Sequence, residues 1–155
     1  MALEKTLVFV KPGNGNLKKR FEILTCLDNL LGKDDWAGYF PILINPVPEK
    51  IIRKHYENIK GKSFYGPTIR AYLDSDGILL KVYYGNNIIS RIRNAVGHTD
   101  PKKSKPGTIR NMFGKDSFEQ AYRERRYLNN VIHASANKKE AEKEINLWKE
   151  YIEID

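Results

Sequence analysis

The 155-residue chain is 41% hydrophobic and 11% aromatic, a composition that excludes a disordered protein and is sufficient to bury the core of one domain, residues 1–155. Its 27 Lys and Arg against 19 Asp and Glu give a net charge of +8, which favours an anionic partner such as a nucleotide, a nucleic acid or an acidic membrane surface. The single Cys26 excludes an intrachain disulfide, and because no apolar run suits a secretory signal or a membrane span, we expect a reduced, soluble, cytoplasmic protein.

Apolar runs typical of buried strands alternate along the chain with segments whose apolar residues recur at helical spacing. Turn and capping residues such as Gly32, Asn45-Pro46 and Asn137 set the limits of several segments. In chain order they predict a strand at 6–10, a helix at 17–31, a loop at 33–38, a strand at 39–44, a helix at 48–59, an irregular or briefly helical segment at 63–76, a strand at 78–84, a helix at 88–96, a long loop at 97–114, a short helix at 118–125, a strand at 130–133 and a last helix from Asn137 to Ile152.

This β-α-β-α-β-α-β-α order indicates a layered α+β or α/β protein, with helices packed on a sheet. Four short strands fit the split β-α-β, ferredoxin-like arrangement about as well as a doubly wound sheet. The pattern alone does not choose between them.

His133 ends an apolar strand and is followed by the small residues Ala134 and Ser135, which leave room for a ligand. A lone histidine in such a place is more often structural. Glu144, one turn into the last helix, can fold back and accept from Nδ1-H of His133, which would leave Nε2 free as a nucleophile. The alternative for Glu144 is a solvated helix face.

Lys11, Arg93 and Arg110 each lie at or beside the end of a predicted element. Phosphoryl transfer needs fixed cations around the migrating group, and the planar guanidinium matches phosphate oxygens. In a chain with 27 Lys and Arg, however, most cations face solvent. The chain has neither a P-loop nor a paired Cys/His metal pattern, so a nucleotide site would be built otherwise and we expect no metal ligands among the side chains.

Taken together, these segments resemble the nucleoside diphosphate kinase family, in order and through nearly the whole chain. The matching stretches are Thr6–Pro12, His55-Tyr56, Arg93–Pro101, Pro106–Arg110 (PGTIR), Asn130–Ser135 (NVIHAS) and Glu140–Trp148. The resemblance implies a ferredoxin-like α+β fold, a four-stranded antiparallel sheet with helices packed on it, here with an inserted helix near 115–128. It also implies transfer of the γ-phosphoryl group of a nucleoside triphosphate, typically ATP, to a nucleoside diphosphate by a ping-pong mechanism.

The resemblance also assigns roles to individual residues. His133 would be phosphorylated, oriented by Glu144 and Ser135, with Tyr56 nearby. Phe64 would stack on the base, and phosphates and sugar hydroxyls would be bound by Lys11, Arg93, Thr99, Arg110 and Asn130. Mg²⁺ would arrive with the nucleotide phosphates, and the protein would form a homo-oligomer, a hexamer or a tetramer of dimers. Nucleic acid would be a secondary partner, and no membrane partner is implied.

Several positions depart from the family pattern: Gly13, Asn111, Met112 and Ala136 replace other residues that are usual there. The segment Lys115–Leu128 is longer than the common form and predicts an extra helix, interpreted as surface decoration, whose arginines could also reach a neighbouring subunit or the nucleotide. A competing hypothesis is a catalytically silent module of this fold that binds nucleic acid or a protein, motivated by the net charge of +8.

Overall fold

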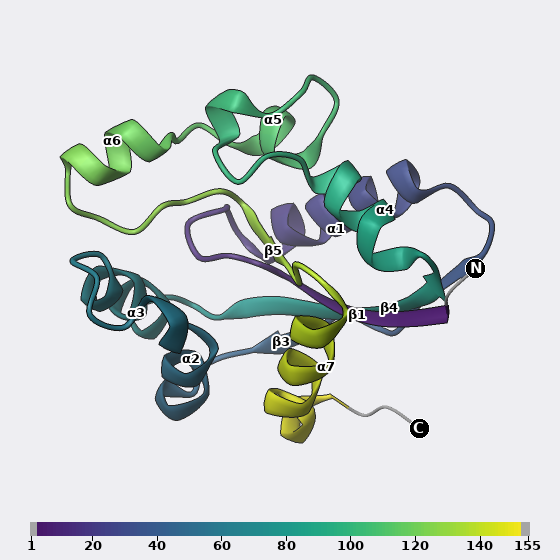
Figure 1. Ribbon diagram of the computed structural model, residues 1–155, viewed down its shortest axis with the longest axis horizontal. Coiled ribbons are helices and arrows are strands. Elements are labelled where there is room, and N and C mark those ends of the chain that lie inside the picture. The colour runs from purple at the N-terminus through teal and green to yellow at the C-terminus, as the bar shows by residue number, and fades with distance from the viewer. Residues whose placement is uncertain (1–2, 153–155) are drawn as a thin grey trace.

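An antiparallel sheet forms the centre of the protein, which the computed structural model describes from residue 3 to residue 152 (Figure 1). Its strands are β1 (Leu3–Val10), β2 (Trp36–Gly38), β3 (Ile42–Ile44), β4 (Ile78–Asn86) and β5 (Ile132–Ala134). The order is β2-β4-β1-β5, and β3 pairs with β4 on the same side as β2. Since every pairing is antiparallel, the sheet is of the ferredoxin-like kind and a doubly wound parallel sheet is excluded.

Helices cover both faces of this sheet (Figure 1). They are α1 (Leu17–Leu31), α2 (Glu49–His55), α3 (Tyr65–Leu73), α4 (Ile88–Val96), α5 (Ile109–Phe113), α6 (Phe118–Arg123) and α7 (Lys138–Leu147). Alternate residues of β1 belong to two hydrophobic cores, one on each face of the sheet. Val8 and Val10 pack with α1 and α4, whereas Leu7 and Phe9 pack with α2, α3 and Trp148. Burial on both faces explains the continuous apolar run of this strand.

The edge of the sheet differs from the sequence prediction. Residues 33–38 were expected as a loop and 39–44 as one strand, but two short strands, β2 and β3, lie end to end along β4. The ladder continues through Tyr39, whose N–H donates to the Val82 carbonyl at 2.9 Å, and is interrupted at Pro41, which has no N–H. The edge position is therefore filled by a broken strand.

Two predicted helical segments also differ in extent. Residues 63–76 contain a nine-residue helix, α3. The helix tolerates Pro67 because this residue falls in its first turn, where backbone N–H groups have no helical partner to lose. The helix predicted at 48–59 ends at His55 and continues as a 3₁₀ turn, Glu57–Ile59. The long loop at 97–114 is ordered and contains a 3₁₀ turn at Pro101–Lys103 as well as α5.

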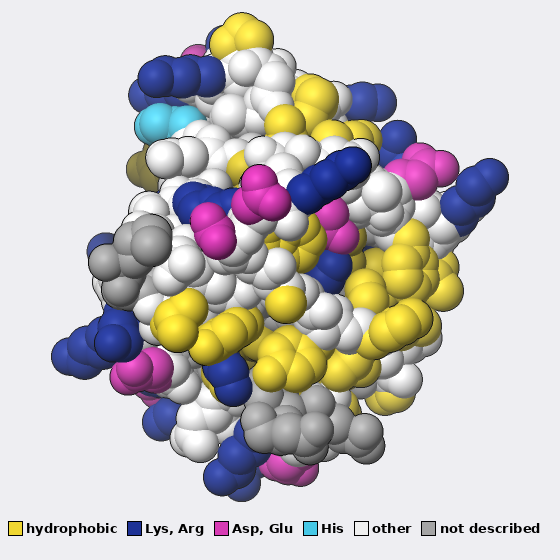
Figure 2. Space-filling model, turned by 90° about the vertical axis from the view of Figure 1, so that its right-hand side faces the viewer, with side chains coloured by type: hydrophobic (Ala, Val, Ile, Leu, Met, Phe, Trp, Pro, Cys, Tyr) yellow, Lys and Arg dark blue, Asp and Glu magenta, His cyan; other side chains and the backbone are white. Residues whose placement is uncertain are grey.

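The surface carries apolar side chains near the broken edge strand: Phe40 is 90% exposed and Leu43 is 43% exposed. Figure 2 shows hydrophobic side chains gathered on the lower part of one face, whereas lysines and arginines are scattered around it. Between residues 3 and 152, no helix has the length and apolar character needed to cross a membrane.

Candidate active site

A cavity of about 430 Å³ brings together nearly all the residues that the sequence singled out. This volume lies in the range of small-molecule sites. The predicted residues that line it are Lys11, Tyr56, Phe64, Arg93, Thr99, Arg110, Asn130, His133 and Glu144. Ser135 is buried behind them, and its hydroxyl donates to Glu144, which lines the cavity. The wall also contains residues that sequence reasoning missed, namely His55, Phe118, Tyr122 and Tyr127.

His133 and Ser135 share one carboxylate oxygen. Oε1 of Glu144 accepts from Nε2 of His133 at 2.8 Å and from the Ser135 hydroxyl at 2.6 Å. The expectation that Glu144 would bond Nδ1 is therefore wrong. The reason is the ring plane: β5 pairs His133 with Phe9, and the two rings stack with centroids 4.8 Å apart, which directs Nε2 toward α7. Because Nε2 carries the proton, Nδ1 has the free lone pair.

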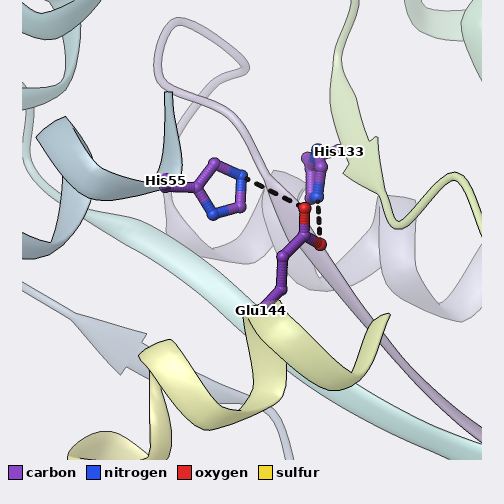
Figure 3. A group of neighbouring side chains, drawn as sticks. All are labelled: His55, His133 and Glu144. Carbon is purple, nitrogen blue, oxygen red and sulfur yellow. Dashed lines mark hydrogen bonds and ion pairs between the residues drawn. The ribbon is translucent and has the colours of Figure 1, made fainter. Parts of the chain in front are cut away.

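His55 lies against the same carboxylate, as Figure 3 shows, but with a fixed tautomer. The indole N–H of Trp148 donates to its Nδ1 at 3.1 Å, and an indole is a donor only, so the proton of neutral His55 is on Nε2. That nitrogen lies 3.9 Å from Oε2 of Glu144. No local sequence pattern could reveal the hydrogen bond between Trp148 and His55, since the two residues are 93 positions apart in sequence.

His55, His133 and Glu144 place potential metal-ligand atoms within 4.8 Å of one another. A metal would need a lone pair on Nε2 of His55, and the Trp148 bond puts a proton there instead, so the geometry favours a hydrogen-bonded group. Burial and then the nearby His133 lower the pKa of His55 to about 3, which keeps this ring neutral. Burial raises the pKa of Glu144, but His133, His55 and Ser135 together outweigh it and bring the pKa to about 2.

Two cations of the site, Lys11 and Arg110, are buried, and Arg93 is partly buried beside them. Burial, and then the charge of Arg110, lower the pKa of Lys11 to about 7. Burial, and then Arg93, lower the pKa of Arg110 to about 10. Arg110 is held by three backbone carbonyls: its Nε donates to Asn130, Nη1 to Gly97 and Nη2 to Ile132. Such fixed, partly desolvated cations suit an anionic ligand.

A strained turn precedes His133. Val131 has a φ of 75°, and the N–H of Ile132 donates to the Asn130 carbonyl at 2.9 Å, which closes a γ-turn. A positive φ is energetically unfavourable for a β-branched residue, and a valine does not indicate such a turn in the sequence, so the turn could not be predicted. The Val131 carbonyl accepts from the N–H of Lys11 at 2.9 Å. The turn therefore joins the strand of Lys11 to that of His133.

The remaining predicted residues line the mouth and floor. Phe64 precedes α3 and is exposed, and the Tyr56 hydroxyl lies 2.6 Å from that of Tyr72. Asn130 donates from Nδ2 to the Thr99 carbonyl at 2.9 Å, while its buried Oδ1 has no hydrogen-bond partner in the described part of the chain. An orphaned buried acceptor of this kind is suited to a ligand hydroxyl.

The departure at Gly13 is accommodated by its neighbour. Gly13 adopts a φ of +86°, which glycine tolerates, and the Asn14 amide donates to the Lys11 carbonyl and to Oδ1 of Asn129, both at 2.9 Å. The turn after Lys11 is thus tied to the segment that leads into β5.

A histidine with one nitrogen bonded to a carboxylate and the other free, beside buried cations, is the arrangement expected of a phosphoryl-transfer enzyme with a covalent intermediate. Comparisons with known proteins agree. The sequence model of the Nucleoside diphosphate kinase family matches residues 42–154. A nucleoside diphosphate kinase of Desulfitobacterium hafniense (strain Y51) is 32% identical over 152 residues, covering 94% of this chain and 87% of that protein. One from Streptococcus pneumoniae (strain JJA) is 38% identical over 102 residues, covering 66% of this chain and 70% of that protein.

Solved structures share the fold. Nucleoside-diphosphate kinase from Borrelia burgdorferi, a transition state mimic with bound vanadate and ADP, has a TM-score of 0.81 and 28% identity, covering 99% of this chain and 92% of that chain. An NDP kinase from Pyrobaculum aerophilum also has a TM-score of 0.81 at 22% identity, covering 98% and 100%, which supports the fold alone. The chain belongs to the nucleoside diphosphate kinase family, whose members are phosphotransferases.

Proposed function

We propose that the protein transfers the γ-phosphoryl group of a nucleoside triphosphate to a nucleoside diphosphate through a phosphohistidine at Nδ1 of His133. The observation that carries this proposal is the 2.8 Å bond between Nε2 of His133 and Glu144, since it leaves the lone pair on Nδ1. The preserved site favours this function over a catalytically silent module.

In the first half-reaction, the Nδ1 lone pair attacks the γ-phosphorus, and the bond from that phosphorus to the β-phosphate oxygen breaks. The diphosphate leaves with the electron pair. The imidazole ring becomes positive and is stabilised by the carboxylate of Glu144, which accepts a hydrogen bond from Ser135. A second diphosphate then attacks the phosphohistidine along the reverse path, so one geometry serves both half-reactions.

The other predicted roles follow the arrangement of the cavity. Lys11, Arg93 and Arg110 neutralise charge on the phosphates, and this charge spreads over the equatorial oxygens during transfer. Phe64 offers a face for the base, while Thr99 and Asn130 lie where sugar hydroxyls and phosphates can bind. Tyr56 stays protonated because burial raises its pKa, so its hydroxyl can donate toward a phosphate near His133.

Mg²⁺ is proposed to enter with the nucleotide, since its ligands are then largely phosphate oxygens and water. The donors around His133 fit this arrangement, because they are mostly cationic and Glu144 is already engaged by His133 and Ser135. Bound with the phosphates, the ion would neutralise part of their charge.

A homo-oligomer in the cytoplasm completes the proposal. The broken edge strand and the exposed Phe40 and Leu43 support assembly, because an unpaired edge with apolar side chains can pair with another copy. A free Cys26 is compatible with the reducing cytoplasm.

The test is incubation with ATP labelled at the γ-phosphate. The protein should acquire an acid-labile, alkali-stable label, and a nucleoside diphosphate should then remove it. His133→Ala should abolish labelling, whereas His98→Ala, at an exposed histidine, should retain it. A His133→Ala protein that still takes up the label would exclude the assignment.

A further inference from the structure

The inserted segment Lys115–Leu128 forms a wall of the cavity instead of lying apart on the surface. Six of its residues, Phe118, Ala121, Tyr122, Arg126, Tyr127 and Leu128, line the cavity that also contains Phe64 and His133. In Figure 1, α6 lies above and α3 below, at the left end of the molecule. Because Phe64 precedes α3 directly, the cavity is bounded by an aromatic residue from each of these two sides.

The helix α6 has one aromatic face and one polar face. Phe118 and Tyr122 are four residues apart and therefore share a face, on the same side as the buried Ala121. The opposite side carries the ion pair of Glu119 and Arg123 at 2.7 Å. Although they line a cavity, Phe118 is 46% exposed and Tyr122 is 80% exposed, so their ring faces are open to a ligand.

The insert is fastened at its base by a two-bond ion pair. Arg126 donates from Nη1 to Oδ2 of Asp116 at 2.7 Å and from Nη2 to Oδ1 at 2.9 Å. The Asp116 side chain is only 9% exposed, and Oδ2 also accepts from the N–H of Asn129 at 3.0 Å. A bidentate arginine–carboxylate contact of this kind fixes the relative orientation of the two side chains and also stabilises their interaction.

The fastened insert is connected to the Lys11 turn. The Asn129 side chain accepts from Asn14 at 2.9 Å and donates to the Gly13 carbonyl at 3.2 Å. The Tyr127 hydroxyl donates to the Pro12 carbonyl at 3.1 Å, and its ring lies 5.9 Å from Nζ of Lys11. The position of α6 is therefore defined relative to the residues around His133.

We propose that Phe118 and Tyr122 receive the face of the nucleobase turned away from Phe64, so that the base slot of this chain is aromatic on both sides. This inference rests on the proposed function, because it takes the ligand of the cavity to be a nucleotide. Every purine and pyrimidine has two π faces, so such a slot strengthens binding without selecting a base. The insert thereby discriminates nucleotides from phosphates that lack a base.

The experiment compares two probes, ADP and ribose 5-diphosphate, which carries the same phosphates without the base. The Phe118→Ala, Tyr122→Ala double variant should bind ADP about 5- to 100-fold more weakly, as expected for the loss of base stacking on aromatic side chains. Its affinity for ribose 5-diphosphate should be unchanged. Tyr122→Phe, which keeps the ring, should bind ADP as the wild type does, whereas Tyr122→Leu should not. Phe21→Ala, at a half-exposed phenylalanine of α1, is the matched control and should change neither affinity.

Unchanged ADP affinity in the double variant, or equal losses for both probes, would overturn the proposal. Labelling of His133 by ATP is measured in parallel. If the wild type acquires no label, the proposed function is rejected. The affinities for ADP and ribose 5-diphosphate would still decide whether the insert contacts the base.

Discussion

Among single residues, His133 depends most on contacts that are distant in sequence. Its place near a strand end, and the places of Lys11 and Arg110 at or beside element ends, could be predicted from the pattern of apolar runs and turns. Which nitrogen is free could not, because it depends on the stacking against Phe9 and on the approach of α7. The tautomer of His55 depends in the same way on Trp148. Site residues were thus predictable where they end an element, but their orientation was not.

The position of the phosphoryl group on the ring is the direct test of this orientation. We expect phosphorylation at Nδ1, because the N–H at Nε2 donates a hydrogen bond to Glu144 and leaves the lone pair on Nδ1. Nitrogen-15 NMR of the phosphorylated protein distinguishes the two isomers by their coupling patterns. A phosphoryl group found on Nε2 would contradict the geometry.

Glu144→Gln should slow both half-reactions by roughly 100-fold, a typical loss when one group that stabilises developing charge is removed. The amide keeps the size and can still accept a hydrogen bond, but it cannot stabilise the positive ring. Pre-steady-state rates of phosphorylation and dephosphorylation measure the effect, beside a thermal melt that should shift little. Glu142→Gln, on the exposed side of α7, is the control. Unchanged rates would show that the charge of Glu144 does not stabilise the positive ring.

Lys11 predicts a pH dependence of binding. Its pKa is lowered to about 7, so in the free protein the ammonium loses its proton as the pH rises through that value. A bound phosphate favours the charged form and raises the pKa again. ADP affinity should therefore fall above about pH 7, by up to tenfold per pH unit, and binding should take up a proton. Calorimetry in buffers of different ionisation enthalpy measures this uptake. Lys11→Arg should remove the dependence, and binding without proton uptake in the wild type would contradict it.

Among the elements, those with a clear internal period were predictable and those defined by a partner were not. The apolar patterns of β1, β4, α1 and α4 predicted their positions closely. The strand β2 was missed because it has three residues and exists through its pairing with β4. At Gly85 a Cβ would touch the Asp35 carbonyl and Trp36, so this pairing depends on a glycine in the other strand. The segment with α6 was interpreted as surface decoration, although it lines the cavity, because a short amphipathic helix does not reveal what it faces.

The attachment of the insert can be tested through Asp116. Asp116→Asn removes the charge that holds Arg126 but keeps the shape and an acceptor for Asn129. Tryptic cleavage after Arg123 or Arg125 should become about fivefold faster, since a loss of about 1 kcal/mol in local stability raises the open population by that factor. ADP should slow it again. Glu49→Gln, which breaks only the exposed pair with Arg53 away from the insert, should leave the rate unchanged. Equal cleavage in all three proteins would show that the ion pair does not hold the segment.

For the whole molecule, the open edge of the sheet predicts self-association. Sedimentation equilibrium should give a mass that is a multiple of 18.0 kDa. Phe40→Asp places a charge on the exposed apolar side chain beside β2 and should lower the assembly constant by about tenfold or more, because burying an unpaired charge is unfavourable. Thr25→Asp, at an exposed position of α1, is a control for the added charge. A monomeric wild type would contradict the expected homo-oligomer.

The binding of Arg110 to three backbone carbonyls has a consequence for the entropy of ligand binding. A long side chain that is mobile in the free protein loses rotamer freedom when it meets a phosphate, at about 0.5–1.5 kcal/mol. Here that loss occurs during folding, before any nucleotide is present. Substitution of Arg110 also removes the donors of buried carbonyls, so part of its effect on turnover will be a loss of conformational stability, and melting temperature and rate have to be measured on the same preparation.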